Sequence, residues 1–189
     1  QSSAASDVYK RQVYWKDGGQ LVPPHDKAIV NKINDTDYTT INFNANLSLI
    51  HSIGKDIDDV FVNAAVKNGV LKLNSNENRD NLSIVFTPLH GTSITAVPAT
   101  LKEAGYKNVH IVEEQAIPNG DFPTVKSPNP EEPDALKMAL DLAEKLKADI
   151  VIGTDPDCDR LGIAVRNNNG KLKLLNGNQT MVILSLIHI

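Results

Sequence analysis

The side chains best suited to chemistry lie in one short stretch of the chain, residues 153–161. Three aspartates stand there at alternate positions and an arginine follows directly: Asp155, Asp157, Asp159 and Arg160. Apolar runs flank this acidic loop (residues 155–160) on both sides, the pattern of two buried strands joined by a tight connection. Three carboxylates gathered at one end of a sheet repel one another, so the pattern favours a bound cation.

Several kinds of site could use such a loop. An EF-hand calcium loop needs Gly at its sixth position and Glu at its twelfth. Counted from Asp155, those positions hold Arg160 and Arg166, which excludes that site. An aspartyl-phosphatase site would use the first aspartate as nucleophile and the aspartate two residues later as acid–base. The spacing fits, although Asp159 stands where such motifs usually have Thr or Val. A solvated acidic turn would not need an apolar strand on each side.

A magnesium site fits the same residues. Mg²⁺ prefers oxygen ligands in compact octahedral geometry and leaves positions for phosphate or water. Carboxylates at alternate positions of a curled loop can point inward together, and Pro156 restricts the loop before binding. Arg160 can offset the excess charge or hold a phosphate oxygen. The pattern therefore predicts a Mg²⁺ site for phosphoryl transfer. We expect Cys158 to be a packed small side chain rather than a nucleophile.

The elements that position this loop alternate between strand and helix. The patterns predict strands at 82–86, 109–112, 148–153, 161–165 and 171–175. They predict helices at 94–104 and 135–146, with a further helix entered at 176–179. Such alternation predicts an α/β fold, a three-layer α/β/α domain whose mixed sheet is mostly parallel and carries helices on both faces.

Two further loops attract attention. Residues 87–93 join a strand to a helix, so free backbone N–H groups and a helix dipole could hold an anion there. By itself that loop is more simply an ordinary β–α turn. Because it and the acidic loop both leave carboxyl ends of strands, we expect them on one rim of the sheet. Residues 113–133 form a long proline-containing loop of the kind that serves function or domain contact.

The N-terminal part is less regular. The patterns predict a hairpin at 13–22, a helix at 26–33, a linker at 34–46 with a short strand at 39–43, a helix at 56–67 and a polar loop at 74–81. The linker is rich in Asn, Asp and Thr, which compete with regular backbone bonding. It is the predicted domain boundary.

Composition excludes several classes of protein. The chain has 189 residues, 41% of them hydrophobic and 22% charged, as in ordinary globular proteins. Its net charge of −4 disfavours a nucleic-acid partner. No apolar run reaches the roughly 18 residues that a membrane span needs. A single cysteine rules out an internal disulfide framework and fits a cytoplasmic protein.

Both ends look cut rather than finished. Residues 1–12 are polar and without pattern, and residues 182–189 stop inside an apolar run. A complete protein rarely ends with an uncovered apolar segment. We therefore expect an internal fragment with non-native flanks, and we base no functional argument on residues 1–12 or 185–189.

The stretch from Gly153 to Gly162 strongly resembles the metal-binding loop of the α-D-phosphohexomutases, most closely the phosphoglucomutase/phosphomannomutase group. Similar stretches elsewhere in the chain are 13–26, 87–92, 112–132 and 175–179, so the resemblance covers about residues 13–184. It implies four segments: a flank at 1–12, the end of a first domain and its linker at 13–38, a second domain with the metal loop at 39–174, and the truncated start of a third at 175–189.

The resemblance also implies a function. Enzymes of this family are intramolecular phosphotransferases of four domains that interconvert hexose 1-phosphate and hexose 6-phosphate, of glucose or mannose. A phosphoserine donates its phosphoryl group, and a hexose bisphosphate intermediate reorients in the site. By the match, Asp155, Asp157 and Asp159 are the ligands of a Mg²⁺ ion that links them to the phosphoserine. Arg160 is the implied catalytic residue, which stabilises charge during transfer.

Some family features are absent from the sequence. It contains no Ser-His-Asn-Pro stretch for the phosphoserine, no sugar loop with paired Glu and no fourth-domain phosphate-binding loop, and Ser93 stands where Gly is common. We expect the isolated chain to be inactive as a mutase. A non-catalytic metal- or phosphate-binding domain of a homologous protein is the alternative, and an aspartyl-type phosphatase is a weaker one.

Overall fold

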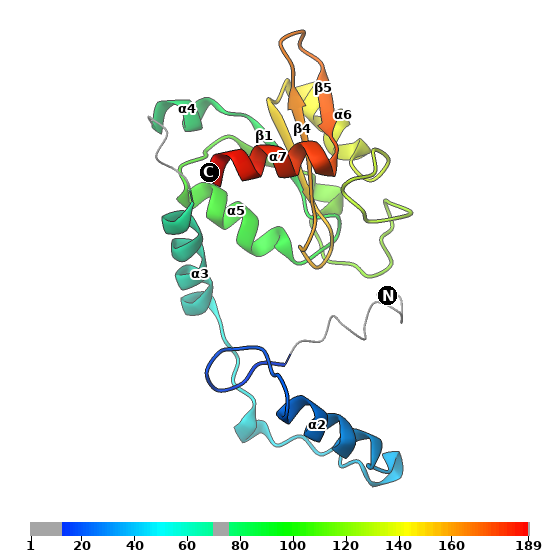
Figure 1. Cartoon of the computed structure of the whole chain (residues 1–189). Coiled ribbons are helices and arrows are strands. Elements are labelled where there is room, and N and C mark those ends of the chain that lie inside the picture. Colours follow the sequence, from blue (N-terminus) through cyan, green and yellow to red (C-terminus); the bar gives the residue numbers. More distant parts are fainter. Residues whose placement is uncertain (1–12, 70–75, 189) are drawn as a thin grey trace. The chain divides into compact units, whose positions relative to one another are not determined.

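The structure, a computed structural model, describes residues 13–69 and 76–188 (Figure 1). The chain forms two compact units, the first ending at Ser52 and the second beginning at Ile53. The boundary predicted after residue 38 therefore lies within the first unit. Among the described residues, no helix has both the length and the apolar character needed to cross a membrane.

From residue 13 onward, where the structure describes it, the first unit contains little regular structure. Its predicted hairpin is reduced to one antiparallel bridge between Tyr14 and Gln20, and its helix is α2, His25–Asn34. Two short 3₁₀ helices follow, η2 (Tyr38–Thr40) and η3 (Leu47–Leu49). The strand predicted at 39–43 is wrong, because the Asp37 side chain accepts a hydrogen bond from the Thr39 N–H (2.9 Å) and turns the backbone into η2.

The second unit holds the elements around the acidic loop. Its helices are α3 (Lys55–Asn68), α4 (Asn76–Asn81), α5 (Ser93–Glu103), α6 (Lys137–Leu146) and α7 (Gly177–His188), with the 3₁₀ helix η4 (Glu113–Gln115). Its strands are β1 (Ile84–Thr87), β2 (Val109–Ile111), β3 (Ile150–Thr154), β4 (Leu161–Arg166) and β5 (Leu172–Leu175). The predicted strands, and the predicted helices that correspond to α3, α5 and α6, begin within one or two residues of these positions.

The prediction of a polar loop at 74–81 is also wrong over residues 76–81. Residues 76–81 form α4, whereas residues 74 and 75 lie outside the described residues. The helix is held by long-range contacts that local sequence does not reveal. Arg79 donates from Nη1 to the Ala104 carbonyl (3.0 Å), and Lys107 pairs with Asp80 (2.7 Å).

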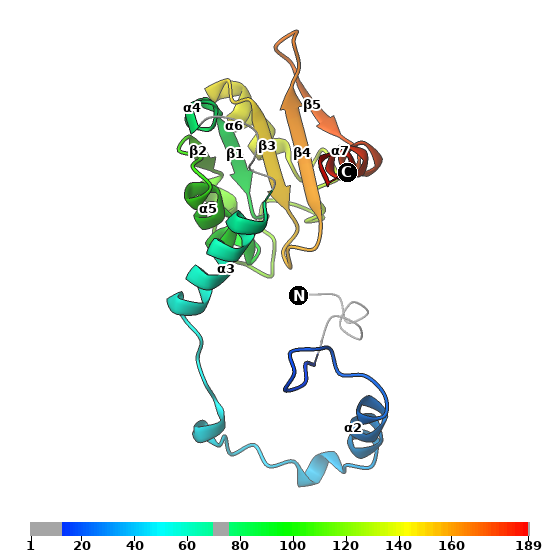
Figure 2. The same cartoon turned by 60° about the vertical axis from the view of Figure 1, so that its left-hand side comes forward.

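The strands form one sheet in the order β2-β1-β3-β4-β5 (Figure 2). The pairings of β1 with β2 and with β3 are parallel, and those of β4 with β3 and with β5 are antiparallel. Short connections join β3 to β4 and β4 to β5, and a short connection can only make an antiparallel pair. The predicted α/β fold with a mixed sheet is therefore confirmed, with the parallel part confined to β2, β1 and β3.

Helices cover both faces of the sheet. The crossover through α5 runs from β1 to β2, and the one through α6 returns past β1 to β3. Right-handed crossovers in opposite directions place their helices on opposite faces. On the α6 face a buried cluster forms the core: Val85, Val112, Ala139, Ala143, Ala148, Val151 and Ala164. Ile84 and Phe86 alternate with Val85 in β1 and are buried on the other face.

This topology brings two loops together. Thr87 at the end of β1 pairs with Gly153 near the end of β3. The loop at residues 87–93 and the acidic loop therefore leave the sheet side by side, as predicted from the carboxyl-end rule.

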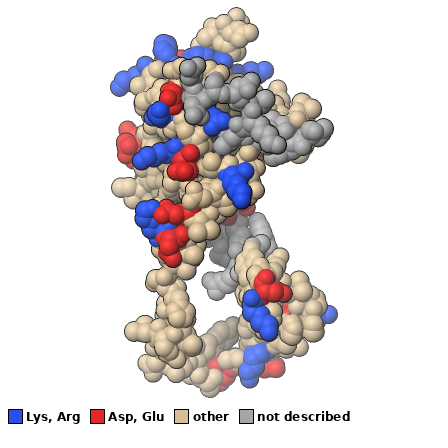
Figure 3. All heavy atoms as spheres, turned by 90° about the vertical axis from the view of Figure 1, so that its left-hand side faces the viewer, with Lys and Arg blue, Asp and Glu red and all other residues tan. Residues whose placement is uncertain are grey.

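On the face drawn in Figure 3, Lys and Arg side chains are interspersed with Asp and Glu rather than gathered in an area of one sign.

Arg166 ties the far end of β4 to the end of α6. Its guanidinium donates to the carbonyls of Ala148 (Nε, 2.8 Å), Ala143 (Nη2, 3.0 Å) and Gly170 (Nη1, 2.6 Å). It also pairs with Glu144 at 3.0 Å. The side chain is only 13% exposed, so water cannot fully replace these partners. One residue thus satisfies carbonyls at a helix end and at a strand turn.

We expect Arg166→Met to lower the free energy of unfolding by about 2 to 4 kcal/mol, because carbonyls that now accept charged hydrogen bonds lose them. Urea denaturation followed by circular dichroism measures this. Lys173→Met on the exposed side of β5 is the matched control and should change stability by less than about 0.5 kcal/mol. Equal losses in the two variants would contradict the role given to Arg166.

Candidate metal centre

The acidic loop brings its three carboxylates together. One oxygen from each of Asp155, Asp157 and Asp159 lies within 4.8 Å of the others, and over the described part of the chain this is the one such group of His, Cys, Asp or Glu. Asp155 is fully buried, whereas the other two are exposed. The donors are all carboxylate oxygens, which fit Mg²⁺ and offer no soft ligand.

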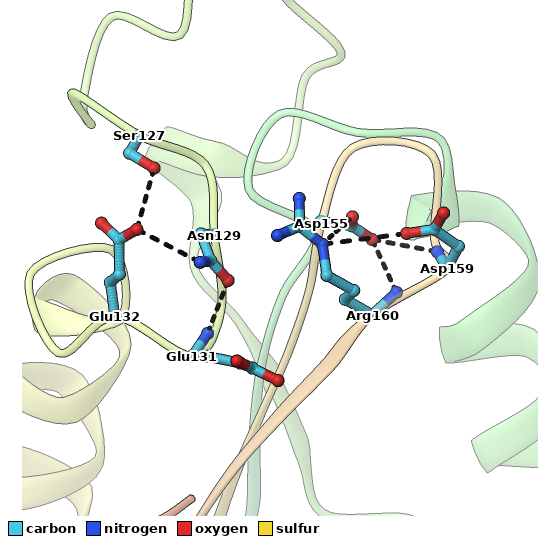
Figure 4. A network of polar contacts seen from close by, with 7 residues as sticks. All are labelled: Ser127, Asn129, Glu131, Glu132, Asp155, Asp159 and Arg160. Carbon is cyan, nitrogen blue, oxygen red and sulfur yellow. Dashed lines mark hydrogen bonds and ion pairs between the residues drawn. The ribbon is translucent and has the colours of Figure 1, made fainter. Parts of the chain in front are cut away.

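Asp155 is the residue around which the loop closes. Its Oδ1 accepts the backbone N–H groups of Asp159 and Arg160, both at 2.9 Å, and its Oδ2 accepts the Arg160 Nε–H at 2.8 Å (Figure 4). Its carbonyl accepts the Cys158 N–H at 3.0 Å. These bonds explain how a fully buried carboxylate is tolerated, since each of its oxygens has a donor.

The charges of the loop are set by these contacts. Burial alone would raise the pKa of Asp155, but hydrogen bonds from the Arg160 backbone and side chain and from Asp159 outweigh it and lower that pKa. The hydrogen bond to Asp155 also raises the pKa of Arg160. Asp155 is therefore ionised and Arg160 charged at neutral pH. The Arg160 Nε also lies 3.8 Å from an oxygen of Asp159.

The exposure of Cys158 differs from the prediction. It is exposed rather than packed, since the turn that closes on Asp155 projects it outward with a left-handed φ of 61°. Partial desolvation raises the pKa of its thiol, and the negative charge of Asp155 raises it further. Because the thiolate is the reactive form, these effects make an exposed thiol a poor nucleophile, as expected from the sequence.

The two other predicted loops border this centre. The N–H of Thr92 donates to the Pro156 carbonyl at 2.9 Å, so the loop at 87–93 touches the acidic loop directly. The long loop packs on β4 at Gly162, where a Cβ would overlap the backbone of Pro130. Its Glu131 faces Arg160 across a hollow of about 560 Å³ that Asp159 also lines (Figure 4). Neither Thr92 nor Glu131 was among the site residues predicted from the sequence.

A glycine pair was the available signal for these contacts. Gly91 lies within the loop at 87–93, and Gly162 lies within the strand predicted at 161–165. A glycine inside such a segment can mark a place where another backbone approaches closely. The identity of the approaching segment depends on the fold and not on the local sequence.

We expect Asp155→Asn to lower the free energy of unfolding by about 2 to 3 kcal/mol at pH 7, the loss typical of one side of a partly buried charged pair. The new amide oxygen can still accept the two backbone N–H groups, but the amide nitrogen faces the Arg160 Nε–H as a second donor. Asp157→Asn, at an exposed position with the same change, is the control.

The stability difference between the parent and Asp155→Asn should depend on pH. Because the folded-state pKa lies below the unfolded value of about 3.9, the carboxylate stabilises the fold above that pH. The difference should shrink as the pH falls through the folded pKa. Urea denaturation from pH 7 to pH 3 measures it, and a constant difference over that range would contradict the ionised state of Asp155.

We expect Cys158 to react with iodoacetamide more slowly at pH 8 than a cysteine in an unstructured peptide, since less of its thiol is ionised. The rate should rise toward the peptide rate when the protein is unfolded in urea. Mass spectrometry of timed samples gives both rates. A folded-state rate above the peptide rate would show that the aspartates and desolvation do not control this thiol.

Known proteins resemble the chain in sequence and in fold. A family model for the phosphoglucomutase/phosphomannomutase α/β/α domain II matches residues 59–170. A phosphoglucomutase of Staphylococcus epidermidis (strain ATCC 12228) is 35% identical over 179 residues, covering 92% of this chain and 32% of the relative. One from Staphylococcus aureus (strain MRSA252) is 45% identical over 106 residues, covering 56% of this chain and 19% of the relative.

Solved structures agree in fold. A crystal structure of a putative phosphomannomutase from Thermus thermophilus has a TM-score of 0.60 at 20% identity, covering 90% of this chain and 35% of that one. A phosphoglucomutase/phosphomannomutase family protein from Burkholderia thailandensis has a TM-score of 0.53 at 20% identity, covering 68% and 25%. The chain thus spans about a third or less of the length of these relatives. It belongs to the phosphoglucomutase/phosphomannomutase family, with its match in the α/β/α domain II.

Proposed function

We propose that the chain supplies the metal-binding part of a phosphohexomutase, with Asp155, Asp157 and Asp159 as Mg²⁺ ligands and Arg160 as a catalytic residue. The observation that carries this proposal is the convergence of three carboxylate oxygens within 4.8 Å in the acidic loop of a family member. Bound there, Mg²⁺ would polarise a phosphoryl group and offset its negative charge.

The residues of the chain have separable parts in this proposal. Asp155 holds the loop closed and keeps one anchored carboxylate in place, while exposed Asp157 and Asp159 can adjust to a ligand. The Nε of Arg160 is bound by Asp155, so its two Nη groups are the ones that can donate to a phosphate oxygen. Arg160 is half-exposed, which lets a phosphoryl group reach it.

The proposed reaction interconverts hexose 1-phosphate and hexose 6-phosphate of glucose or mannose through a hexose bisphosphate. The phosphoryl donor is proposed to be a phosphoserine in a part of the protein outside this sequence. Residues 13–38, 39–174 and 175–189 are proposed as the end of a first domain, a second domain and the start of a third. An aspartyl phosphatase is less favoured, because Asp159 stands where such motifs usually have Thr or Val.

We expect the chain to bind Mn²⁺, a paramagnetic substitute for Mg²⁺, and to release it on addition of excess Mg²⁺. Asp157→Asn and Asp159→Asn should each weaken the affinity by at least about 10- to 100-fold, the loss typical of an outer-shell partner, because a direct ligand costs at least as much. Electron paramagnetic resonance titration measures free Mn²⁺. Asp141→Asn, on the exposed side of α6, is the control and should bind as the parent does. Undiminished binding in the loop variants would contradict the site.

The proposed mutase reaction can be tested separately from metal binding. The 189-residue chain is expected to show no turnover of glucose 1-phosphate, because its sequence contains no Ser-His-Asn-Pro stretch for the phosphoserine. In the whole protein, the phosphoryl group should be found on a serine and should remain there in Asp155→Asn. A measurable rate from the chain alone, or a phosphoryl group on Asp155, would reject the division of roles proposed above.

A further inference from the structure

The start of α5 contacts the first half of the acidic loop at several atoms. The Thr92 N–H and its Oγ1–H both donate to the Pro156 carbonyl, at 2.9 and 3.1 Å. The Ser93 and Thr154 hydroxyls share a hydrogen bond of 2.6 Å. A Cβ on Gly91 would overlap the Pro156 backbone, so the two segments are in direct backbone contact. These contacts join the segment that follows β1 to the end of β3 and the start of the acidic loop.

The segment that makes these contacts is itself fixed. Leu89 and His90 have left-handed φ values of 46° and 60° and are buried. The Leu89 N–H donates to the Thr87 hydroxyl at 3.1 Å, and the His90 N–H donates to the carbonyl of buried Gln115 at 2.9 Å. The His90 ring lies 2.9 Å from the Thr124 hydroxyl. Moving the segment would break buried hydrogen bonds, so it offers a rigid anchor.

A hydrogen bond to the Pro156 carbonyl constrains the backbone of the acidic loop next to Asp157. This carbonyl belongs to the peptide that joins Pro156 to Asp157, so its orientation sets the backbone direction at Asp157. The side chains of Asp157 and Asp159 are exposed, so they lie outside the packed core. The hydrogen bonds from Thr92 therefore act on the part of the loop where packing constrains the carboxylates least.

We propose that Thr92 is a positioning residue for the acidic loop: its hydroxyl and N–H orient the Pro156–Asp157 peptide so that the carboxylates of Asp155, Asp157 and Asp159 converge. The identity of the ligand, Mg²⁺, rests on the proposed function above. The ordering of the loop by Thr92 does not depend on any ligand.

Thr92 allows a clean test because it is exposed and can be changed nearly isosterically. Thr92→Val removes the hydroxyl donor, and Thr92→Ser restores it. Thr36→Val is the matched control, since Thr36 is partly exposed and its hydroxyl donates to the Lys32 carbonyl at 2.6 Å within the first unit. The comparison separates the loss of any threonine hydrogen bond from the loss of this one.

The first measurement is amide hydrogen exchange by NMR without metal. The Asp159 and Arg160 amides report on loop closure because they donate to the Asp155 carboxylate. Thr92→Val should speed their exchange about three- to tenfold, the population change that loss of one hydrogen bond brings. Thr92→Ser and Thr36→Val should leave it unchanged.

The second measurement is Mn²⁺ affinity by electron paramagnetic resonance. Thr92→Val should bind Mn²⁺ about three- to tenfold more weakly, because part of the population must reorder before binding. Thr92→Ser should bind as the parent does. The thermal unfolding midpoint of Thr92→Val should match that of Thr36→Val.

The outcomes distinguish this proposal from the proposed function. Unchanged exchange at Asp159 and Arg160 in Thr92→Val overturns the positioning role. Faster exchange that extends equally to the amides of β1 and β3 also overturns it, since that is global destabilisation. A parent chain that binds no Mn²⁺, together with faster exchange confined to the acidic loop, overturns the metal site and supports the positioning role.

Discussion

The buried carboxylate of Asp155 is the constraint on which the rest of the centre depends. A charge with no exposed surface is tolerated only when nearby donors replace water, and the donors here come from the next turn of the same loop. Satisfying Asp155 therefore curls residues 155–160. The curl brings Asp159 back toward Asp155, turns Cys158 outward and fixes the Nε end of Arg160.

The surrounding fold meets this loop at close range. Gly91 allows the backbone at residue 156 to approach the first loop, and Gly162 allows the long loop to pack on β4. In β3, a Cβ at Gly153 would overlap the side chain of Leu136. The strand is therefore also in close contact with the residue that precedes α6. Because these glycines have no side chains, the loop at 87–93, the long loop and the acidic loop can lie together at one end of the sheet.

Much of this arrangement follows from the sequence. Alternating apolar patterns predicted the strands and helices around the acidic loop, because local periodicity and burial agree there. Local periodicity failed at α4 because distant contacts of Arg79 and Lys107 hold that helix. It failed at residues 38–40 because a local hydrogen bond to the Asp37 side chain directs the backbone into a 3₁₀ turn. The exposure of Cys158 and the contact of Thr92 follow from loop closure and strand order, which residue spacing does not encode.

The acidic loop is the turn of an antiparallel hairpin, since β3 pairs with β4 from Thr154 and Leu161 onward. All candidate metal ligands and Arg160 thus belong to one continuous run of backbone with both ends anchored in one sheet. The sheet fixes the backbone at both ends of this ligand set, while the side chains of exposed Asp157 and Asp159 can still adjust to a ligand. Surrounding segments can therefore shift without separating the backbone positions that carry these carboxylates.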